Sequence, residues 1–361
     1  MMARRDPDRL LIVKLSSIGD VVQSLPVLAA LRRRFPQAYI AWAVKPAAAD
    51  VLVGSPHLSE TLVLGGDHAE EPGVRRLPPL TAPGRLARAL RGIRFDLALD
   101  MQGLLKSALV AYLSGAPERI GFRNRQEGAF LLNTRSVVPD RRDTHAVDAY
   151  LGFAEALRAP VLPLDFTIAT TEADRETAAR LLGDRDDVVA LVPGARWLSK
   201  RWPTARFAIV ADALGAEFGC TSVVVGGPSD GALAAEIASA ATSAVLDLTG
   251  RTSLKQLAEV FRRCRAVVSN ETGPMYIAAA VGAPTVAIFG PTDPKRLGPY
   301  GDGHAKVTAR VPCGPCRRRS CRPLSCMEKI TPEQVIAEAR KLLGRTRVGG
   351  QDCRPTTASP A

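Results

Sequence analysis

The sequence predicts an α/β protein made of two domains, each built on a parallel sheet. Short apolar runs alternate with amphipathic helical patterns, and parallel strands need such helical crossovers. The chain has 361 residues, which is more than one hydrophobic core usually holds. A proline-bounded segment at 160–163, PVLP, separates two stretches of this alternating pattern. We therefore expect one domain over residues 1–162 and a second from residue 163.

The strand-to-helix corner at residues 10–26 is the segment around which the first half is organised. Residues 10–13 are apolar and predict a buried strand, Gly19 permits a tight turn, and an amphipathic helix follows. Pro26 is expected in a first helical turn, where amides have no intrahelical partner. Asp20 then lies at a strand end, which is the rim of the ligand crevice in an open α/β sheet. The alternative is a first-turn acid that the helix dipole favours.

Two more features of the first half are candidate ligand contacts. The strand predicted at 96–100 ends in a second corner that carries Gln102 and Lys106. These side chains would face the same crevice, or they would serve only loop backbone and solvent. Residues 119–125, RIGFRNR, are expected to form a basic loop. Its Arg119 and Arg123 suit a carboxylate or phosphate, unless the loop is simply solvated.

In the second half, the predicted strands end in polar loops that contain glycine. The strands are expected at 188–192, 221–225, 245–248, 266–269 and 285–289. Loop amides and helix N-termini suit a diphosphate, and Thr272 and Gly273 open one such helix. Lys200 adds a positive charge, and Asp230 suits a ribose diol. Each residue alone is explained by turn and cap chemistry, but such loops gathered at one sheet edge favour a nucleotide site.

Two common nucleotide motifs are absent from these corners. Neither GxGxxG nor GxxxxGK[ST] occurs there, which argues against a dinucleotide dehydrogenase and a P-loop ATPase.

The composition favours anionic partners. Lys and Arg number 48 against 36 Asp and Glu, a formal net charge of +12. Aromatic residues are only 5% and do not alternate with basic ones, so no nucleic acid partner is expected. No apolar run approaches the ~18 residues of a membrane span, and the run at 10–13 is too short for a signal-peptide core. We expect a cytoplasmic protein that touches an acidic membrane surface peripherally.

Four of the seven cysteines form a compact basic cluster: Cys313, Cys316, Cys321 and Cys326. The first pair has zinc-like spacing, and four thiolates would suffice for a structural site. Disulfides are less expected in a reducing compartment, and free thiols in a surface loop are the other alternative. Our assignment has no metal site, with zinc or another soft metal kept as an alternative.

Five stretches, in order along nearly the whole chain, carry a family resemblance. They are KLSSIGDVVQSLPVLAALR (14–32), DMQGLLKSAL (100–109), PGARWLSKRWP (193–203), SNETGPMYIAAAVGAPTVAIFGPTDP (269–294) and CGPCRRRSCRPLSCMEKITPEQV (313–335). Together they make the chain similar to glycosyltransferase family 9, the ADP-heptose:lipopolysaccharide heptosyltransferases. The ordered set is specific, whereas no single piece is. The sequence departs from some relatives at Arg196, in place of a hydroxyl residue, and from many at Tyr276, in place of histidine.

The resemblance implies a GT-B architecture, in which two Rossmann-like domains face each other across a cleft. Residues 1–162 would bind the acceptor, and residues 163–330 would bind the nucleotide-sugar. A helix at 331–344 would pack back across the domain junction. The remaining residues, 345–361, contain Pro, Thr and Ser and are expected to be a disordered tail.

The resemblance also implies an inverting transfer of heptose from ADP-heptose to the lipopolysaccharide inner core, on a Kdo or heptose acceptor, without a cofactor. Asp20 would be the general base. The acceptor would contact Ser17, Gly19, Gln102, Lys106, Arg119 and Arg123. The ADP-sugar donor would contact Lys200, Asp230, Thr252, Glu271, Thr272, Gly273 and Tyr276. The partners are then this donor, the lipopolysaccharide core and the inner membrane leaflet.

Three alternatives remain open. A related transferase would use another nucleotide-sugar. A sugar-nucleotide epimerase of the same architecture would need acids in its cleft but no acceptor site. A non-catalytic nucleotide-sugar-binding module is disfavoured because Asp20 and Lys200 are both present.

Overall fold

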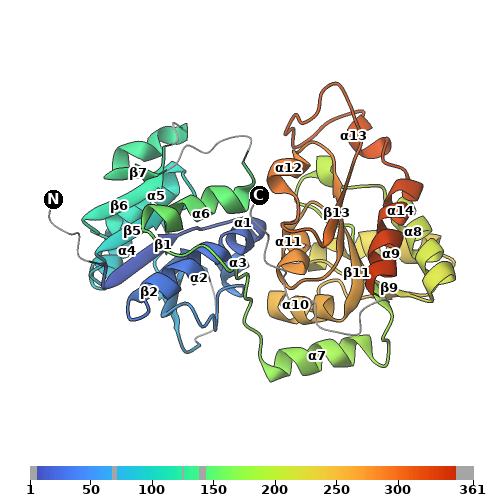
Figure 1. Cartoon of the computed structure of the whole chain (residues 1–361), viewed down its shortest axis with the longest axis horizontal. Coiled ribbons are helices and arrows are strands. Elements are labelled where there is room, and N and C mark those ends of the chain that lie inside the picture. The colour runs from blue at the N-terminus through green and yellow to red at the C-terminus, as the bar shows by residue number, and fades with distance from the viewer. Residues whose placement is uncertain (1–5, 67–70, 124–125, 138–143, 347–361) are drawn as a thin grey trace. The chain divides into compact units, whose positions relative to one another are not determined.

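The computed structural model describes residues 6–66, 71–123, 126–137 and 144–346 (Figure 1). The chain divides into two compact units, Met1–Ala169 and Thr170–Ala361. The division falls after Ala169, whereas the sequence placed it after Leu162. The tail was predicted from residue 345, but the last helix extends to Thr346. The rest of the predicted tail, from residue 347 onward, and Arg125 of the basic stretch lie outside the described residues.

The first unit is a seven-stranded parallel sheet with the strand order β4-β3-β2-β1-β5-β6-β7. Its strands are β1 (Arg9–Val13), β2 (Tyr39–Val44), β3 (Glu60–Leu64), β4 (Val74–Leu77), β5 (Leu97–Asp100), β6 (Glu118–Phe122) and β7 (Arg135–Val137). Its helices are α1 (Ile18–Gln23), α2 (Leu25–Arg34), α3 (Pro46–Ala49), α4 (Pro83–Arg91), α5 (Leu105–Leu113) and α6 (Ala146–Ala156), with a 3₁₀ segment η1 (Gln126–Leu132).

The second unit is a six-stranded parallel sheet with the order β10-β9-β8-β11-β12-β13. Its strands are β8 (Val188–Val192), β9 (Thr221–Val224), β10 (Val245–Asp247), β11 (Cys264–Asn270), β12 (Thr285–Phe289) and β13 (His304–Thr308). Its helices are α7 (Glu172–Leu182), α8 (Thr204–Phe218), α9 (Gly231–Ala240), α10 (Leu254–Arg262), α11 (Gly273–Ala280), α12 (Pro294–Leu297), α13 (Ser325–Glu328) and α14 (Pro332–Thr346), with 3₁₀ turns η2 (Leu198–Lys200) and η3 (Pro228–Asp230).

Each sheet has one point at which the strand order reverses direction along the chain. In the first unit β1 pairs with β2 on one side and β5 on the other, and Val13 is in register with Asp100. In the second unit β8 lies between β9 and β11. Loops that leave adjacent strands at such a switch point diverge and open a ligand crevice beyond the carboxyl ends of the strands. The β1, β5, β8 and β11 loops are therefore where the topology favours a site.

The structure changes two local predictions in the first unit. The first helix is broken at Ser24 into α1 and α2, because Pro26 then falls in the first turn of α2, where no amide hydrogen bond is lost. The basic stretch predicted as a loop begins as strand β6, whose Ile120, Gly121 and Phe122 are buried beside β5. Three arginines within seven residues obscured this short strand.

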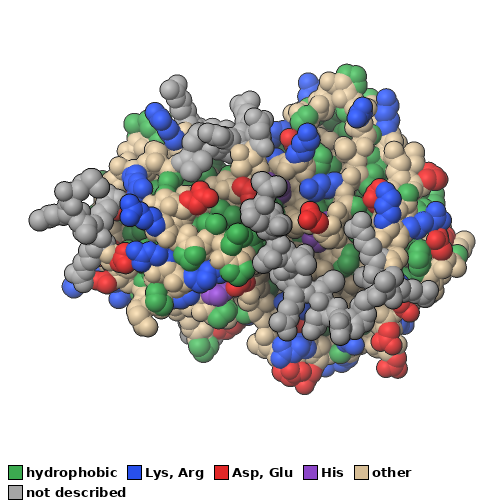
Figure 2. Space-filling view, viewed as in Figure 1, with side chains coloured by type: hydrophobic (Ala, Val, Ile, Leu, Met, Phe, Trp, Pro, Cys, Tyr) green, Lys and Arg blue, Asp and Glu red, His purple; other side chains and the backbone are tan. Residues whose placement is uncertain are grey.

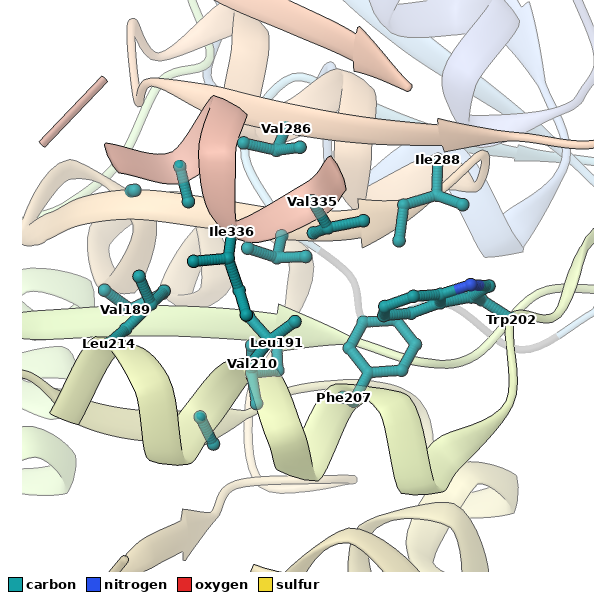
Figure 3. Packing of buried hydrophobic residues seen from close by; sticks show 14 of the residues in the cluster. Val189, Leu191, Trp202, Phe207, Val210, Leu214, Val286, Ile288, Val335 and Ile336 are labelled. Carbon is teal, nitrogen blue, oxygen red and sulfur yellow. The ribbon is translucent and has the colours of Figure 1, made fainter. Parts of the chain in front are cut away.

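The second unit packs α8 and α14 against its sheet around one hydrophobic core (Figure 3). The rings of Trp202 and Phe207 meet edge to face, with centroids 5.1 Å apart. From α14, Val335 and Ile336 are buried in this same core. The contacts of α14 with α8, β11, β12 and β13 attach the helix firmly to the second unit. The predicted return of this helix across the domain junction stays a prediction.

Among the described residues, no helix combines the length and apolarity needed to cross a bilayer. On the face shown in Figure 2, Lys and Arg side chains occur over both units, with acidic side chains among them.

Candidate active site

Asp20 lies in the first turn of α1, directly after the switch-point strand β1. Its Oδ2 accepts hydrogen bonds from the Ser17 backbone amide (3.0 Å) and the Ser17 hydroxyl (2.7 Å). Its Oδ1 accepts a hydrogen bond from the Tyr150 hydroxyl at 3.0 Å. The Asp20 side chain nevertheless keeps 39% of its surface exposed. The carboxylate is thus held by its neighbours and still open to a ligand.

A buried lysine supplies the charge that faces this carboxylate. Lys14 at the end of β1 is only 3% exposed, and its Nζ lies 3.6 Å from Asp20 Oδ1. The same ammonium donates a hydrogen bond of 2.7 Å to the Tyr150 hydroxyl. Partial burial alone would raise the pKa of Asp20, but the Lys14 charge and the Ser17 and Tyr150 hydrogen bonds outweigh it and lower the pKa. Asp20 is therefore ionised at neutral pH.

The loop after β5 lies against the loop after β1. The sequence alone leaves open whether Gln102 and Lys106 face the crevice near Asp20 or serve only loop backbone and solvent. Gln102 Oε1 accepts a hydrogen bond from the Leu15 amide at 2.8 Å, so this side chain ties the two loops together rather than pointing freely at a ligand. Ser17 is exposed and bound to Asp20, and Gly19 is buried within α1. Lys106 is exposed near the start of α5.

Arg119 is not the free ligand contact that the sequence suggested. It lies on β6, and its guanidinium donates hydrogen bonds to the backbone oxygens of Leu132 (2.8 Å) and Ala116 (2.7 Å). These two hydrogen bonds join β6 to the end of η1 and to the segment before the strand. Arg123, by contrast, is exposed just beyond the end of β6, so it alone of this pair remains a candidate acceptor contact.

In the second unit, Lys200 and Glu271 form an ion pair between the β8 and β11 loops. Lys200 Nζ lies 2.8 Å from Glu271 Oε1. The other carboxylate oxygen accepts a hydrogen bond from Thr292, which follows β12. The Lys200 side chain is 15% exposed and that of Glu271 is 4% exposed. Three neighbouring strand ends therefore contribute to one polar cluster at the second switch point.

Asn270 fixes the conformation of the loop that carries Lys200. This buried residue at the end of β11 accepts from the Trp202 amide (3.2 Å) and donates to the Pro193 carbonyl (2.7 Å). It thereby joins the two ends of the β8–α8 loop. Trp202 itself is core, since its indole is 1% exposed and donates to the Ile330 carbonyl. The KRWP segment is thus anchored by Trp202, and this leaves Lys200 at the polar cluster.

The cysteine-containing loop adds a second cation near Lys200. Ser199 donates a 2.6 Å hydrogen bond to the Arg318 carbonyl. The Trp197 ring has Lys200 Nζ at 4.4 Å from its centroid and the Arg319 guanidinium at 5.3 Å. Both cations are attracted electrostatically to the π face of the indole ring.

Asp230 packs where the β8 and β9 loops meet. A Cβ on Gly194 would lie 2.4 Å from Asp230 Oδ2, and one on Gly226 would lie 2.7 Å from the same atom. A side chain at either position would therefore displace the Asp230 carboxylate. Asp230 Oδ2 also accepts from the Gly227 amide at 3.0 Å. The carboxylate is partly buried rather than freely displayed, which fits the turn chemistry as well as a ribose contact.

The other predicted donor residues fall into two groups. Thr272 and Gly273 are half-buried at the N-terminus of α11, directly after Glu271, and Thr252 is half-buried before α10. Tyr276 is buried and its hydroxyl donates to the Leu297 carbonyl at 2.8 Å. That contact holds α12 in place, so Tyr276 has a structural role that its position in the motif did not reveal.

The four clustered cysteines are free thiols: Cys313 is exposed, Cys316 and Cys321 are half-buried and Cys326 is buried. Within the part of the chain that the structure describes, no group of three or more His, Cys, Asp or Glu is arranged to hold a metal ion.

Comparison with known proteins assigns the family. The sequence model described as glycosyltransferase family 9 (heptosyltransferase) matches residues 84–326. The chain belongs to this family. It is 28% identical to lipopolysaccharide heptosyltransferase 1 of Pseudomonas aeruginosa, over 93% of this chain and 98% of that one.

Solved structures agree with the family 9 assignment. Escherichia coli ADP-heptose lipopolysaccharide heptosyltransferase II superposes with a TM-score of 0.77 at 25% identity, covering 94% of this chain and 99% of that one. The family 9 glycosyltransferase of Veillonella parvula gives a TM-score of 0.81 at 25% identity, covering 94% and 98%. This family 9 chain is a glycosyltransferase with the GT-B fold, as its sequence resemblance implied.

Sequence reasoning missed four residues that organise the two clusters of this family 9 chain: Lys14, Tyr150, Asn270 and Thr292. Lys14 carried a signal, because a lysine directly after four apolar strand residues faces burial. Tyr150 carried none, since 130 positions separate it from Asp20. Asn270 and Thr292 fitted ordinary turn positions, and only the strand order shows that each meets a partner from another loop.

Proposed function

We propose that this glycosyltransferase moves heptose from ADP-heptose to the inner core of lipopolysaccharide, with inversion at the transferred carbon. The names of its relatives support the donor and the acceptor class. The observation that carries the mechanism is the ionised, partly exposed Asp20 carboxylate at the switch point of the first unit. An acceptor-side base and a donor-side cation cluster are the two parts that such a transfer needs.

In the proposed reaction, Asp20 takes the proton of an acceptor hydroxyl as that oxygen attacks the anomeric carbon. The new carbon–oxygen bond forms while the bond from the anomeric carbon to the diphosphate oxygen breaks, and its electron pair leaves with ADP. Attack from the face opposite the leaving group inverts the configuration. The proton remains on the Asp20 carboxyl until solvent removes it, so the step balances without a cofactor.

The second unit supplies what the departing diphosphate needs. Negative charge grows on the leaving oxygen, and Lys200 with the α11 N-terminus at Thr272 and Gly273 can oppose it. Lys200 is paired with Glu271 in the structure, so donor binding exchanges a carboxylate partner for a diphosphate one. Glu271, freed from this pair, is then available to accept a hydrogen bond from a sugar hydroxyl.

A transfer assay decides between this function and its alternatives. The purified chain is incubated with ADP-heptose and a lipopolysaccharide core acceptor lacking heptose, and the products are identified by mass spectrometry. The expected result is a mass gain of one heptose on the acceptor and release of ADP. Isomerised donor formed without acceptor would support an epimerase. Binding of ADP-heptose with no product would support a binding module. Transfer only from another nucleotide-sugar would overturn the donor assignment.

We also propose peripheral contact with an acidic membrane surface, supported by the net charge of +12. Vesicles containing about 30% anionic lipid should pull the chain down in low salt, and neutral vesicles should not, because counterions screen the attraction. Binding should fall steeply between about 50 and 300 mM NaCl. Equal binding to neutral and anionic vesicles, or binding insensitive to salt, would contradict an electrostatic origin.

A further inference from the structure

Three residues from two distant parts of the first unit form a chain of polar contacts that ends on Asp20. The Lys14 ammonium donates to the Tyr150 hydroxyl, and that hydroxyl donates to Asp20 Oδ1. Lys14 comes from the end of β1, and Tyr150 comes from α6, which packs on α1 and α2. Lys14 Nζ also lies 4.6 Å from the centre of the Tyr150 ring. A hydroxyl that accepts from an ammonium becomes a stronger donor toward the carboxylate.

The hydrogen bonds of Asp20 distinguish its two oxygens. Oδ2 accepts from both the amide and the hydroxyl of Ser17, so its two lone pairs are occupied. Oδ1 accepts one hydrogen bond, from Tyr150, and has Lys14 at the longer distance of 3.6 Å. A carboxylate oxygen accepts about two hydrogen bonds. The remaining capacity for an incoming hydroxyl is therefore on Oδ1.

We propose that Lys14 and Tyr150 are positioning residues for transfer: Lys14 keeps Asp20 ionised, and Tyr150 orients Oδ1 to receive the acceptor proton. The inference rests on the proposed function of Asp20 as base and goes beyond it by naming the proton-accepting oxygen and the groups that prepare it. In this scheme both residues act through the Asp20 carboxylate, and neither contacts the acceptor hydroxyl or the anomeric carbon.

A purely structural explanation of the buried lysine is less satisfactory. Lys14 is 3% exposed, and a buried ammonium without an anionic partner costs several kcal/mol. Asp100 also feels the Lys14 charge, but burial raises its pKa. The Asp20 carboxylate lies with Oδ1 3.6 Å from Lys14 Nζ, so the structure places an anionic partner directly beside the buried ammonium.

Other charged groups lie on the elements packed around α1. On α6 they are His145 at the N-cap, Asp148 and Glu155; α3 is flanked by Lys45 and Asp50; and α2 ends in Arg32, Arg33 and Arg34. The contributions that hold down the Asp20 pKa come from Lys14, Ser17 and Tyr150. The pH dependence of transfer should therefore respond to Lys14 and Tyr150 more than to these other groups.

The first test replaces Lys14 by Met and, separately, by Arg. An opposite charge within ~4–6 Å lowers a carboxyl pKa by about 1–3 units, so Lys14→Met should move the acid limb of kcat/KM upward by about 1–3 pH units. Lys14→Arg keeps the charge and should leave the limb near its native position. Lys45→Met, which removes an exposed charge after β2, is the matched control and should not move the limb.

The second test is Tyr150→Phe, which keeps the ring and removes only the hydroxyl. We expect kcat to fall about tenfold through lost alignment and the acid limb to rise by about one pH unit, because the ionised Asp20 carboxylate loses a hydrogen bond that favours it. The donor KM should change less than twofold. Tyr39→Phe, also in the first unit, is the control. Native pH profiles for both Lys14→Met and Tyr150→Phe, or a uniform loss of activity at every pH, would overturn the proposal.

The failure of this inference can be told apart from failure of the proposed function. If the native chain transfers no heptose, the assignment of function fails. The Asp20 carboxyl can still be titrated by carbon-13 NMR, with Asp20→Asn identifying its resonance. A midpoint that rises in Lys14→Met supports the electrostatic part, and an unchanged midpoint contradicts it. Retained ADP binding and cooperative thermal unfolding show that each variant is folded; an unfolded Lys14→Met leaves Tyr150→Phe to decide.

Discussion

Replacing Asp20 by Asn should reduce heptose transfer by about 10²–10⁴-fold, because the acceptor hydroxyl then has no group to take its proton and general-base contributions are typically of this size. ADP affinity should stay within about twofold of the native value, since the donor cluster is built from residues of the second unit. Single-turnover transfer and calorimetric ADP binding measure the two quantities. Transfer at a native rate would remove Asp20 from its role as base.

A matched acid separates catalysis from helix stabilisation. Asp148 occupies the first turn of α6, in the same unit, as Asp20 occupies that of α1. If Asp20 were only a first-turn acid that the helix dipole favours, Asp148→Asn and Asp20→Asn would lose similar stability and neither would lose transfer. We expect Asp148→Asn to transfer normally, whereas Asp20→Asn does not.

The pH dependence of stability gives an independent check on Asp20. Its folded-state pKa lies below the ordinary value of 3.8, so the ionised carboxylate stabilises the native state above that value. This stabilisation is lost as the pH falls through the folded pKa. The difference in unfolding free energy between native chain and Asp20→Asn should therefore be larger at pH 7 than at pH 3. An equal difference at both pH values would contradict the lowered pKa.

Replacing Lys200 by Met should weaken the use of the donor more than any other single change in the second unit. Loss of one preorganised donor to developing negative charge typically costs ~10²–10³ in turnover. We expect kcat to fall by about that factor and the donor KM to rise several-fold, because Lys200 opposes charge already present on the bound diphosphate. Lys295→Met, an exposed lysine on α12 of the same unit, should change neither parameter. Native kinetics in Lys200→Met would exclude Lys200 from the donor site.

The Lys200–Glu271 pair adds a second comparison. If Lys200 leaves Glu271 to bind diphosphate, Glu271→Gln removes a competitor for the ammonium and should leave ADP affinity unchanged or higher. Turnover should still fall, because the amide replaces a carboxylate placed for the sugar. A loss of ADP affinity in Glu271→Gln as large as that in Lys200→Met would show that the two residues act only as a structural pair.

Local patterns are sufficient to locate both clusters. Four or five consecutive apolar residues predict a strand, and glycine with a helix-cap residue marks where that strand ends. The strand-to-helix loops that carry Asp20, Lys200, Asp230 and Glu271 can therefore be located from residue spacing. The same patterns fail at β6, where three arginines suggest a loop. They also give one helix where α1 and α2 are separated at Ser24.

The partners of these side chains could not be predicted in the same way. Arg119 is committed to two carbonyls and Tyr276 to a third, which no local pattern shows. Both residues fitted a binding role by residue type and by motif. Part of their hydrogen-bonding capacity is used by backbone groups that come near only after the strands and helices have packed.

By itself, the sequence determined the α/β class, the two parallel-sheet halves and the strand ends at which polar chemistry collects, because each depends on the spacing of neighbouring residues. Only the tertiary structure decided which charges meet. Tyr150 reaches Asp20 because α6 packs on α1, and Lys200 reaches Glu271 because β8 and β11 are neighbours in the sheet. The ionisation of the proposed base follows from those long-range contacts, since the Lys14 charge and the Tyr150 hydroxyl act on it only in the folded chain.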